Sequence, residues 1–450
     1  MNNTGENKMG VMSVGKLLIN MALPMIASML AQAFYNIVDS IYISRVSESA
    51  VTALSLAFPV QNMMISFSAG LAVGVNSLLS RSLGEKNQKM ANKSAGNGIT
   101  LVIIAMFLFM IFGAFGARPY YQMQSDVAET VNGGTAYVQI ICLLSFGSFM
   151  QVLLERLLQS TGRTMYSMIT QGTGAIVNII LDPIFIFGYF GIPKMGIAGA
   201  AVATVIGQFI AAFMAFMFNI KKNPDIQLSV ADLKLQAEAV KRIIVVGIPS
   251  LVMMAIGSVM NFGMNQILQG FSETATGVFG IYYKLQSIFF MPIFGMNGAT
   301  ISIVAYNYGA KNKDRMLRAV SLAIRVAVVI MVCGMLAFEI VPDVLLGIFN
   351  PSDEFLAIGI KALRTIAIHF PVAAVCIILG GVFQALGNGI YSTIVSLTRQ
   401  LVVLLPVAYL LSLSGNVDNV WWAFVAAEVA SLAITLICYR KMYNDKIRDL

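Results

Sequence analysis

Long apolar stretches separated by short polar segments make up nearly the whole chain. A helix needs about 20 apolar residues to cross the hydrocarbon core of a bilayer. Runs of that length, bounded by charges or by Gly, Pro and Asn, occur twelve times. They lie near residues 16–40, 51–80, 95–117, 131–157, 164–190, 196–219, 240–268, 276–307, 317–340, 356–385, 390–413 and 419–439. The pattern predicts an all-α polytopic membrane protein with twelve transmembrane helices.

Composition supports this class and excludes several others. The chain has 450 residues, of which 58% are hydrophobic and only 11% charged, whereas soluble domains average about 25% charged residues. A soluble domain, a disordered chain, a disulfide scaffold and a soluble nucleic-acid binder are therefore excluded. We expect the lipid bilayer to be a partner and no nucleic acid to bind. The net charge of +8 reflects an excess of Lys and Arg. In a membrane protein such an excess usually marks cytoplasmic loops beside anionic lipid.

The distribution of positive charge predicts the orientation. With an even number of spans both termini lie on the same side of the membrane, and most of the 29 Lys and Arg residues fall in loops on that side. By the positive-inside rule we expect both termini to be cytoplasmic. The longest polar segment, 220–242, lies almost at mid-chain and is interpreted as a cytoplasmic linker.

The second half of the chain repeats the first, with residue numbers shifted by a constant 225. Matched pairs are Pro24 and Pro249, Gln61 and Gln286, Gly70 and Gly295, Gly84 and Gly309, and Gln159 and Gln384. A constant offset over nearly half the chain indicates duplication. We predict a six-helix lobe over 1–219 and another over 243–450. Six spans per unit make the repeat parallel, with a pseudo-twofold axis along the membrane normal. Such an arrangement suits transport by alternating access across a central cavity.

Acidic residues inside two of the predicted spans are the strongest functional signal. Placing an acid at mid-membrane costs a few kcal/mol, so each one needs a reason. Asp39 lies one helical turn after Tyr35, and Asn178 and Asp182 share a helix face at positions i and i+4. Thr204, in the next span, offers a further oxygen ligand. We place a cation-coupling site at these five residues.

Two ions fit such a site. Neighbouring desolvated carboxylates raise the pKa of at least one of them and so make a proton carrier, whereas the same oxygens also suit Na⁺. The alternative is that the side chains only bond neighbouring helices. The repeat favours function, because the equivalent positions in the second half are Met264, Val403, Val407 and Val429, and packing needs would apply to both halves. Pro24 removes a backbone donor from the first span, and we interpret it as a hinge.

Polar residues in the second half are harder to interpret. Lys284 lies deep in an apolar run together with Tyr282 and Gln286. These three could line a substrate cavity, or Lys284 could form a structural ion pair. Glu155 and Arg156 fall at the predicted end of the fourth span, where we expect a solvated pair.

No motif for nucleotide or cofactor chemistry is present. The sequence contains no GxxxxGK[ST] run, so ATP is not expected to drive the protein. Its four cysteines are isolated and its one histidine has no evident partner, so we expect no cofactor, no resident metal and no catalytic residues. Either an ion gradient then supplies the energy, or transport runs downhill.

The residues resemble the multidrug and toxic compound extrusion (MATE) transporters, in their bacterial MepA-like group. The resemblance covers the whole chain and rests on LPMIASMLAQAFYNIVDSIYIS, YYKLQ, NIILDPIFIFG and GIAGAAVATVIGQ. It implies a plasma-membrane antiporter that exports diverse, often cationic and amphipathic drugs in exchange for H⁺ or Na⁺. It also implies a cation site at Asp39, Asn178, Asp182 and Thr204, with Tyr35 beside it and Pro24 as the bend. We expect a monomer.

Two other functions compete with this one. A flippase for lipid-linked precursors would share the architecture, but it favours a cavity rich in Arg and Lys, and the spans hold few of these residues. A membrane-embedded enzyme would need a catalytic grouping such as His with Asp, which the sequence does not show. The choice between H⁺ and Na⁺ stays open because the same oxygens bind both.

Overall fold

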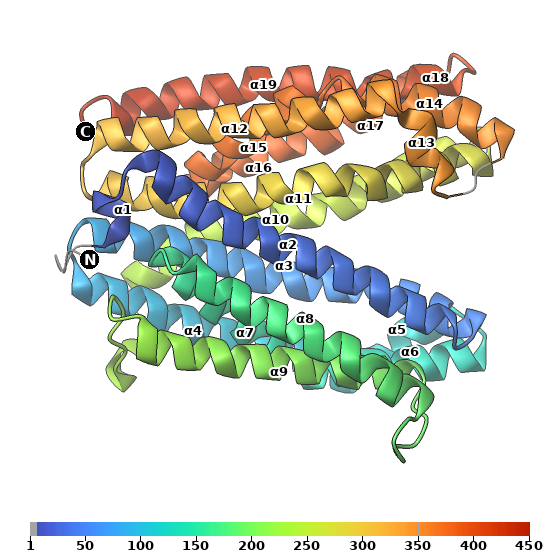
Figure 1. Cartoon of the computed structure of the whole chain (residues 1–450), viewed down its shortest axis with the longest axis horizontal. Helices are drawn as coiled ribbons and strands as arrows, with labels where there is room; N and C mark the ends of the chain where they lie inside the picture. Colours follow the sequence, from blue (N-terminus) through green and yellow to red (C-terminus); the bar gives the residue numbers. More distant parts are fainter. Residues whose placement is uncertain (1–6, 350–351) are drawn as a thin grey trace.

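The computed structural model describes residues 7–349 and 352–450, and the all-α fold expected from the sequence is confirmed there (Figure 1). The first half holds α1 (Lys8–Val11), α2 (Val14–Ser44), α3 (Glu48–Gly84), α4 (Gln88–Ile111), η1 (Phe112–Gly116), α5 (Ala117–Gln122), α6 (Ala128–Leu143), α7 (Phe146–Ser160), α8 (Thr164–Phe187) and α9 (Ile197–Lys222). After a turn, η2 (Val230–Leu233), the second half holds α10 (Ala237–Gln269), α11 (Glu273–Gly309), α12 (Lys313–Ile340), α13 (Pro342–Gly347), α14 (Asp353–Ala367), α15 (Phe370–Ala385), α16 (Gly389–Leu397), η3 (Thr398–Leu404), α17 (Leu405–Ser412), α18 (Val417–Val420), α19 (Trp422–Met442) and η4 (Tyr443–Ile447).

Ten helical segments in the described part of the chain are long and apolar enough to cross a membrane, and two bent pairs bring the number to twelve. The expected spans 131–157 and 356–385 are these pairs. The chain bends by 46° between α6 and α7 and by 49° between α14 and α15. Pro371 explains the second bend, because it lies at the start of α15 and cannot donate a backbone hydrogen bond to the preceding turn.

Helix boundaries reproduce the sequence repeat. Helix α3 matches α11 residue for residue, and α8 matches the segment from α16 to α17 in the same way. The caps repeat as well: Ser47 accepts from the backbone N–H of Ala50, and Ser272 from that of Ala275. Side-chain capping satisfies a helix-end donor, so the duplicated sequence encodes the same local structure twice.

The two halves form two groups of helices, α2–α9 and α10–α19, which we call the N-lobe and the C-lobe (Figure 1). Between them α2 packs on α11 and α3 packs on α10. A Cβ on Gly70 would lie 2.8 Å from Leu251, and a Cβ on Gly295 would lie 2.8 Å from Ile26. The two glycines are equivalent positions of the repeat, and so are their two partners. The interface is therefore self-complementary, as expected for a twofold axis.

Another pair of glycines lies between the lobes toward the end of the molecule where α1 and the C-terminus lie, here called the terminal end (Figure 1). A Cβ on Gly84 would lie 1.9 Å from the carbonyl oxygen of Tyr306, and one on Gly309 would lie 2.1 Å from that of Arg81. Only glycine leaves room for such backbone contacts. The lobes are therefore held together at the terminal end by a symmetric pair of glycines.

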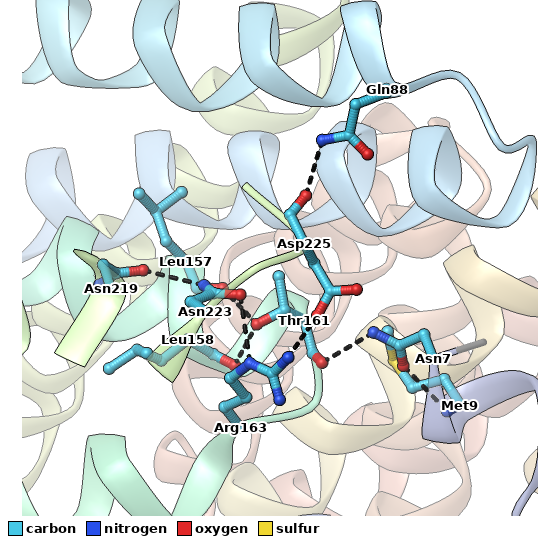
Figure 2. A network of polar contacts seen from close by, with 10 residues as sticks. All are labelled: Asn7, Met9, Gln88, Leu157, Leu158, Thr161, Arg163, Asn219, Asn223 and Asp225. Atoms are coloured by element: carbon cyan, nitrogen blue, oxygen red, sulfur yellow. Dashed lines mark hydrogen bonds and ion pairs between the residues drawn. The ribbon is translucent and has the colours of Figure 1, made fainter. Parts of the chain in front are cut away.

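The polar connection between the lobes is fixed to the N-lobe (Figure 2). It runs over 223–236, shorter than the expected 220–242, because α9 and α10 continue into polar sequence. Arg163 Nη2 lies 2.7 Å from Asp225 Oδ2, and Gln88 Nε2 donates to the Asp225 carbonyl at 2.8 Å. Nearby, Asn7 donates to the carbonyl of Thr161 at 3.0 Å, so the start of the described chain lies beside this network.

Candidate cation site

The residues expected to bind a cation lie at a common depth in the N-lobe. Asp39 is five residues from the end of α2, Asp182 is five residues from the end of α8, and Thr204 is seven residues after the start of α9. At 1.5 Å per residue these positions lie roughly 7–11 Å from the helix ends. All three are nearer the end of the bundle opposite the terminal end.

Asn178 joins two of the three helices. Its Nδ2 atom donates to Asp182 Oδ1 and to Thr204 Oγ1, both at 3.2 Å. Asp182 is fully buried and Asn178 is 2% exposed. The buried atoms Asp182 Oδ2 and Asn178 Oδ1 have no hydrogen-bond partner among the described residues. Each unpaired buried oxygen costs free energy, so the arrangement favours the uptake of a positive partner.

Helix α2 supplies the second carboxyl group. Asp39 is partly buried, and its Oδ1 atom is a further buried oxygen without a partner among the described residues. Asp39 lies close enough to Asp182 for their charges to interact, and Tyr35 lies within the same range of both. No ion pair to either carboxylate occurs in residues 7–349 and 352–450. Hydrogen bonds thus join Asn178, Asp182 and Thr204, and charge interactions relate Asp39 and Tyr35 to Asp182.

Small residues let these helices approach closely. A Cβ on Gly207 of α9 would lie 2.7 Å from the carbonyl oxygen of Gly174 on α8 and 3.4 Å from Asn178 Cβ. Near the start of α9, a Cβ on Gly199 would lie 2.5 Å from the Phe185 carbonyl. The small-residue stretch of α9 therefore brings Thr204 within reach of α8, as small residues do between membrane helices.

Pro24 leaves one backbone acceptor of α2 unused, and α8 satisfies it. A proline cannot donate to the carbonyl four residues earlier, here Asn20. Thr164 Oγ1 donates to that carbonyl at 3.3 Å, while Ser28 Oγ donates to the Pro24 carbonyl at 3.0 Å. Helix α2 remains one helix through Pro24, with the missing bond replaced by a contact to the helix that carries Asp182.

The sequence reasoning missed two neighbours of the site. Tyr137 of α6 is 1% exposed and interacts electrostatically with Asp39, Tyr35 and Asp182. Its hydroxyl accepts a hydrogen bond of 2.6 Å from Gln61 Nε2 of α3. Nothing in the sequence distinguishes Tyr137 from the other aromatic residues of the apolar runs. Its partner Gln61 recurs as Gln286 in the repeat, and this recurrence was the signal that could have drawn attention to Gln61.

The expectation of a solvated Glu155–Arg156 pair is wrong. Glu155 is 6% exposed and lies inside the N-lobe. It accepts hydrogen bonds from Thr170 Oγ1 at 2.9 Å and from Gln151 Nε2 at 3.1 Å. The error arose because α7 continues to Ser160, so Glu155 lies more than a turn inside the helix. Unlike Asp182, which accepts one such bond from Asn178, Glu155 accepts hydrogen bonds from two neutral side chains.

The residues suggested for a substrate cavity lie in two different environments. Tyr282 is 1% exposed among aromatic rings of the C-lobe core, including those of Phe279 and Phe424. Its hydroxyl donates to Gln286 Oε1 at 2.7 Å. Lys284 is exposed and forms no ion pair with the described residues. The structural ion pair considered for Lys284 is therefore absent from this part of the chain.

The C-lobe contains an acid of a different kind. Glu428 of α19 is 3% exposed, and its Oε2 atom lies 3.7 Å from Arg399 Nη1. His369 is also buried, with its ring against Phe424 and Phe370. A cation of the chain itself thus faces the C-lobe acid, whereas the N-lobe acids have none among the described residues.

The donor set defines what the N-lobe site can bind. The described residues contain no group of three or more His, Cys, Asp or Glu side chains that could hold a metal ion. Two carboxylates, one amide oxygen and one hydroxyl remain, a set that suits a proton or a hard monovalent cation bound reversibly.

Comparison with known proteins decides the family. The sequence profile of the MatE family matches residues 24–184 and again residues 249–410, which together cover well over half of the chain. The chain belongs to the MatE family. The two matches begin at Pro24 and Pro249, an equivalent pair of the repeat, so the family profile describes each lobe separately.

Relatives of this MatE-family chain are similar along its entire length. The multidrug export protein MepA of Staphylococcus saprophyticus is 25% identical over 429 residues, which cover 95% of this chain and 94% of that protein. MepA of Staphylococcus aureus is 26% identical over 437 residues, with the same coverage. A solved structure described as the outward-facing conformation of a multidrug resistance MATE family transporter has the same fold, with a TM-score of 0.91, 24% identity and 99% coverage of both chains.

Proposed function

We propose that this MatE-family chain is a secondary active multidrug antiporter that exports diverse, often cationic and amphipathic compounds in exchange for H⁺ or Na⁺ by alternating access. One observation carries the proposal: the N-lobe holds two neighbouring carboxyl groups with buried, unpaired oxygens and no ion-pair partner among the described residues. A group of this kind is expensive in a membrane unless a cation neutralises it. The names of the MepA relatives support drugs as the second substrate.

Helix α2 supplies the proposed link between ion and drug. It carries Asp39 near one end, and Met25 and Ile26, near its middle, contact Gly298 and Gly295 of the C-lobe. The two regions are separated by roughly 20 Å along one helix. Cation binding at Asp39 would change how α2 packs on α8, and α2 would pass this change to the lobe interface. Ion and drug must favour different states for exchange to occur.

Ethidium efflux from proteoliposomes tests this function, with pH and Na⁺ gradients imposed separately. We expect one gradient to drive efflux by the wild-type protein and Asp39→Asn to reduce efflux to the level of empty liposomes. The matched control is Asp126→Asn, which neutralises an exposed acid of the same lobe and should leave efflux unchanged. Full gradient-driven efflux by Asp39→Asn would exclude the proposal. If neither gradient moves ethidium while a labelled lipid is flipped, the flippase function replaces it.

A further inference from the structure

A pocket of about 370 Å³ lies between the lobes at the terminal end. Its walls come from α3, from α10, from the residues that follow α15 and from η4. Four lining side chains are cationic, and one is acidic. They are Arg81, Lys241, Arg242 and Lys446, with Glu238 as the acid. The volume lies within the range of roughly 300–1,000 Å³ that is typical of small-molecule sites.

The chain itself neutralises these cations only in part. Glu238 pairs with Arg242 at 2.6 Å, so the one acid in the pocket wall is already used. Arg81 pairs with Glu85 at 2.7 Å. The side chain of Lys241 has no hydrogen bond or ion pair to the residues that the structure describes.

Lys446 has only neutral partners in this pocket. Its Nζ atom donates to the carbonyl of Leu386 at 2.8 Å and to Asn388 Oδ1 at 2.9 Å. The like charge of Arg81 acts on Lys446 more strongly than the opposite charge of its exposed neighbour Asp445, which does not line the pocket. Two cations held near each other are stabilised by an anion between them, and the pocket is where such an anion would lie.

The pseudo-twofold axis supplies a second site for comparison. The residues equivalent to pocket residues Arg81, Leu386 and Gly387 are Tyr306, Thr161 and Gly162, on the other side of the axis. These equivalents contact the segment that carries α1. Asn7 donates to the Thr161 carbonyl at 3.0 Å (Figure 2), Lys8 Cε would lie 3.0 Å from a Cβ on Gly162, and a Cβ on Gly10 would lie 3.2 Å from the Tyr306 ring.

The α1 segment also binds the C-lobe, so it fills its site from both sides. Asn307 Nδ2 donates to the carbonyl of Met9 at 3.3 Å, and Arg315 Nε donates to the same carbonyl at 3.0 Å. Of two related sites at the lobe interface, one is therefore occupied by the chain itself. The other is an open pocket lined by cations.

We propose that the open pocket binds a phosphate group, carried by an anionic lipid headgroup or by a soluble phosphate. Arg and Lys are the side chains that bind phosphate best, and basic pockets between membrane helices bind lipid headgroups. Arg81 belongs to the N-lobe, whereas Lys241, Arg242 and Lys446 belong to the C-lobe. Separation of the lobes at the terminal end would divide the pocket, so the phosphate stabilises the state in which the lobes touch there.

Melting temperatures of the purified full-length protein test the binding. In detergent, inorganic phosphate is titrated against chloride at equal ionic strength; in nanodiscs, phosphatidylglycerol is compared with phosphatidylcholine. We expect at least one of the two phosphate carriers to raise the melting temperature of the wild type. In Lys241→Gln/Lys446→Gln the concentration needed for half of the shift should rise about tenfold, because two charged contacts are lost. Lys241→Gln alone should show a smaller increase.

Lys222→Gln is the matched control. It removes an exposed lysine, the last residue of α9, which does not line the pocket. A response to phosphatidylglycerol alone identifies a lipid, and a response to inorganic phosphate identifies a soluble ligand. Lys241 is exposed and its side chain has no described partner, so its single variant should fold even if the double variant does not. If wild type, Lys222→Gln and Lys241→Gln respond equally to both probes, or none of them responds, the proposal is overturned.

A distance measurement tests the link to conformation. Spin labels at Lys89 on α4 and Lys441 on α19, both exposed, report the separation of the lobes at the terminal end. The effective phosphate carrier should shift the distance distribution of the wild type toward shorter values and, at the same concentration, shift that of Lys241→Gln less. An identical shift in both proteins would show that the anion acts elsewhere.

Discussion

The N-lobe and the C-lobe share their helix boundaries but treat buried acids in opposite ways. In the C-lobe, Glu428 faces Arg399 at 3.7 Å. In the N-lobe, Asp39 and Asp182 lie close enough for their charges to interact, and no described cation pairs with them. A buried ion pair supplies its own counter-charge, whereas two carboxyl groups whose charges repel need a counter-charge from outside.

This difference separates a structural acid from one suited to ion exchange. Duplication gave both lobes the same helices, so packing alone would favour similar residues at equivalent positions. Instead the positions equivalent to Asp39 and Asp182 are Met264 and Val407, and Met264 is fully buried in the C-lobe core. The backbone differs here too, because residues 398–404, equivalent to 173–179 of α8, form the π-helix η3. These differences favour ion coupling in one lobe only.

Asp182→Asn should have the largest effect on transport. The asparagine keeps the shape of the side chain and can still accept from Asn178, so the melting temperature should stay close to that of the wild type. Its neutral amide cannot take up H⁺ or hold Na⁺ by charge, so gradient-driven ethidium efflux should fall to background. Efflux and melting temperature are measured on the same preparations. Undiminished efflux would place the coupling acid elsewhere.

Glu428→Gln should lower stability and leave ion coupling intact, the reverse of what we expect for Asp182→Asn. Removal of one partner from a buried ion pair costs about 3–5 kcal/mol. Since the Arg399 side chain is 25% exposed, we expect a loss of about 1–3 kcal/mol in the free energy of unfolding. The coupling ion and its stoichiometry should not change. A variant that is stable but uncoupled would mean that the C-lobe acid also carries ions, and the comparison would fail.

Glycine substitutions at the lobe interface should give a smaller, conformational effect. Gly84→Ala and Gly309→Ala would each drive a Cβ into a backbone carbonyl of the other lobe, so both should lengthen the Lys89–Lys441 spin-label distance. The pseudo-twofold axis predicts similar effects for the two variants. Gly172→Ala is the control, because a Cβ there meets no atom within 4 Å. Unchanged distances would show that these contacts do not hold the lobes together.

The sequence predicted features that depend on periodicity and composition. The spans and the repeat follow from runs of apolar residues and from matched positions. The contact of Asn178 with Asp182 follows from i, i+4 spacing on one helix. Contacts between helices were harder: the hydrogen bond from Thr170 to Glu155 joins two helices, and neither residue signals the other.

The bends between α6 and α7 and between α14 and α15 were not predicted from the sequence. Pro371 marks the second bend, but the first, after Leu143, has no proline. The open pocket could not be predicted either, because Arg81, Lys241 and Lys446 are far apart in the chain and meet only through the packing of α3, α10 and η4. The sequence around one Lys or Arg does not show which other cationic side chains lie beside it in the folded protein.

Lys8→Met should have the smallest effect, a change in how the melting temperature depends on pH. It tests how the α1 segment fills its site. Burial, and secondarily the charge of Arg163, lowers the pKa of Lys8 from 10.5 to about 8. The unfolded chain therefore binds more protons between pH 8 and 10.5, and stability should rise with pH across that window. Lys8→Met should flatten the rise in melting temperature between pH 8 and 9.5. Lys222→Met, at an exposed lysine, should retain the rise. If both variants keep the wild-type slope, Lys8 is not buried at the lobe interface.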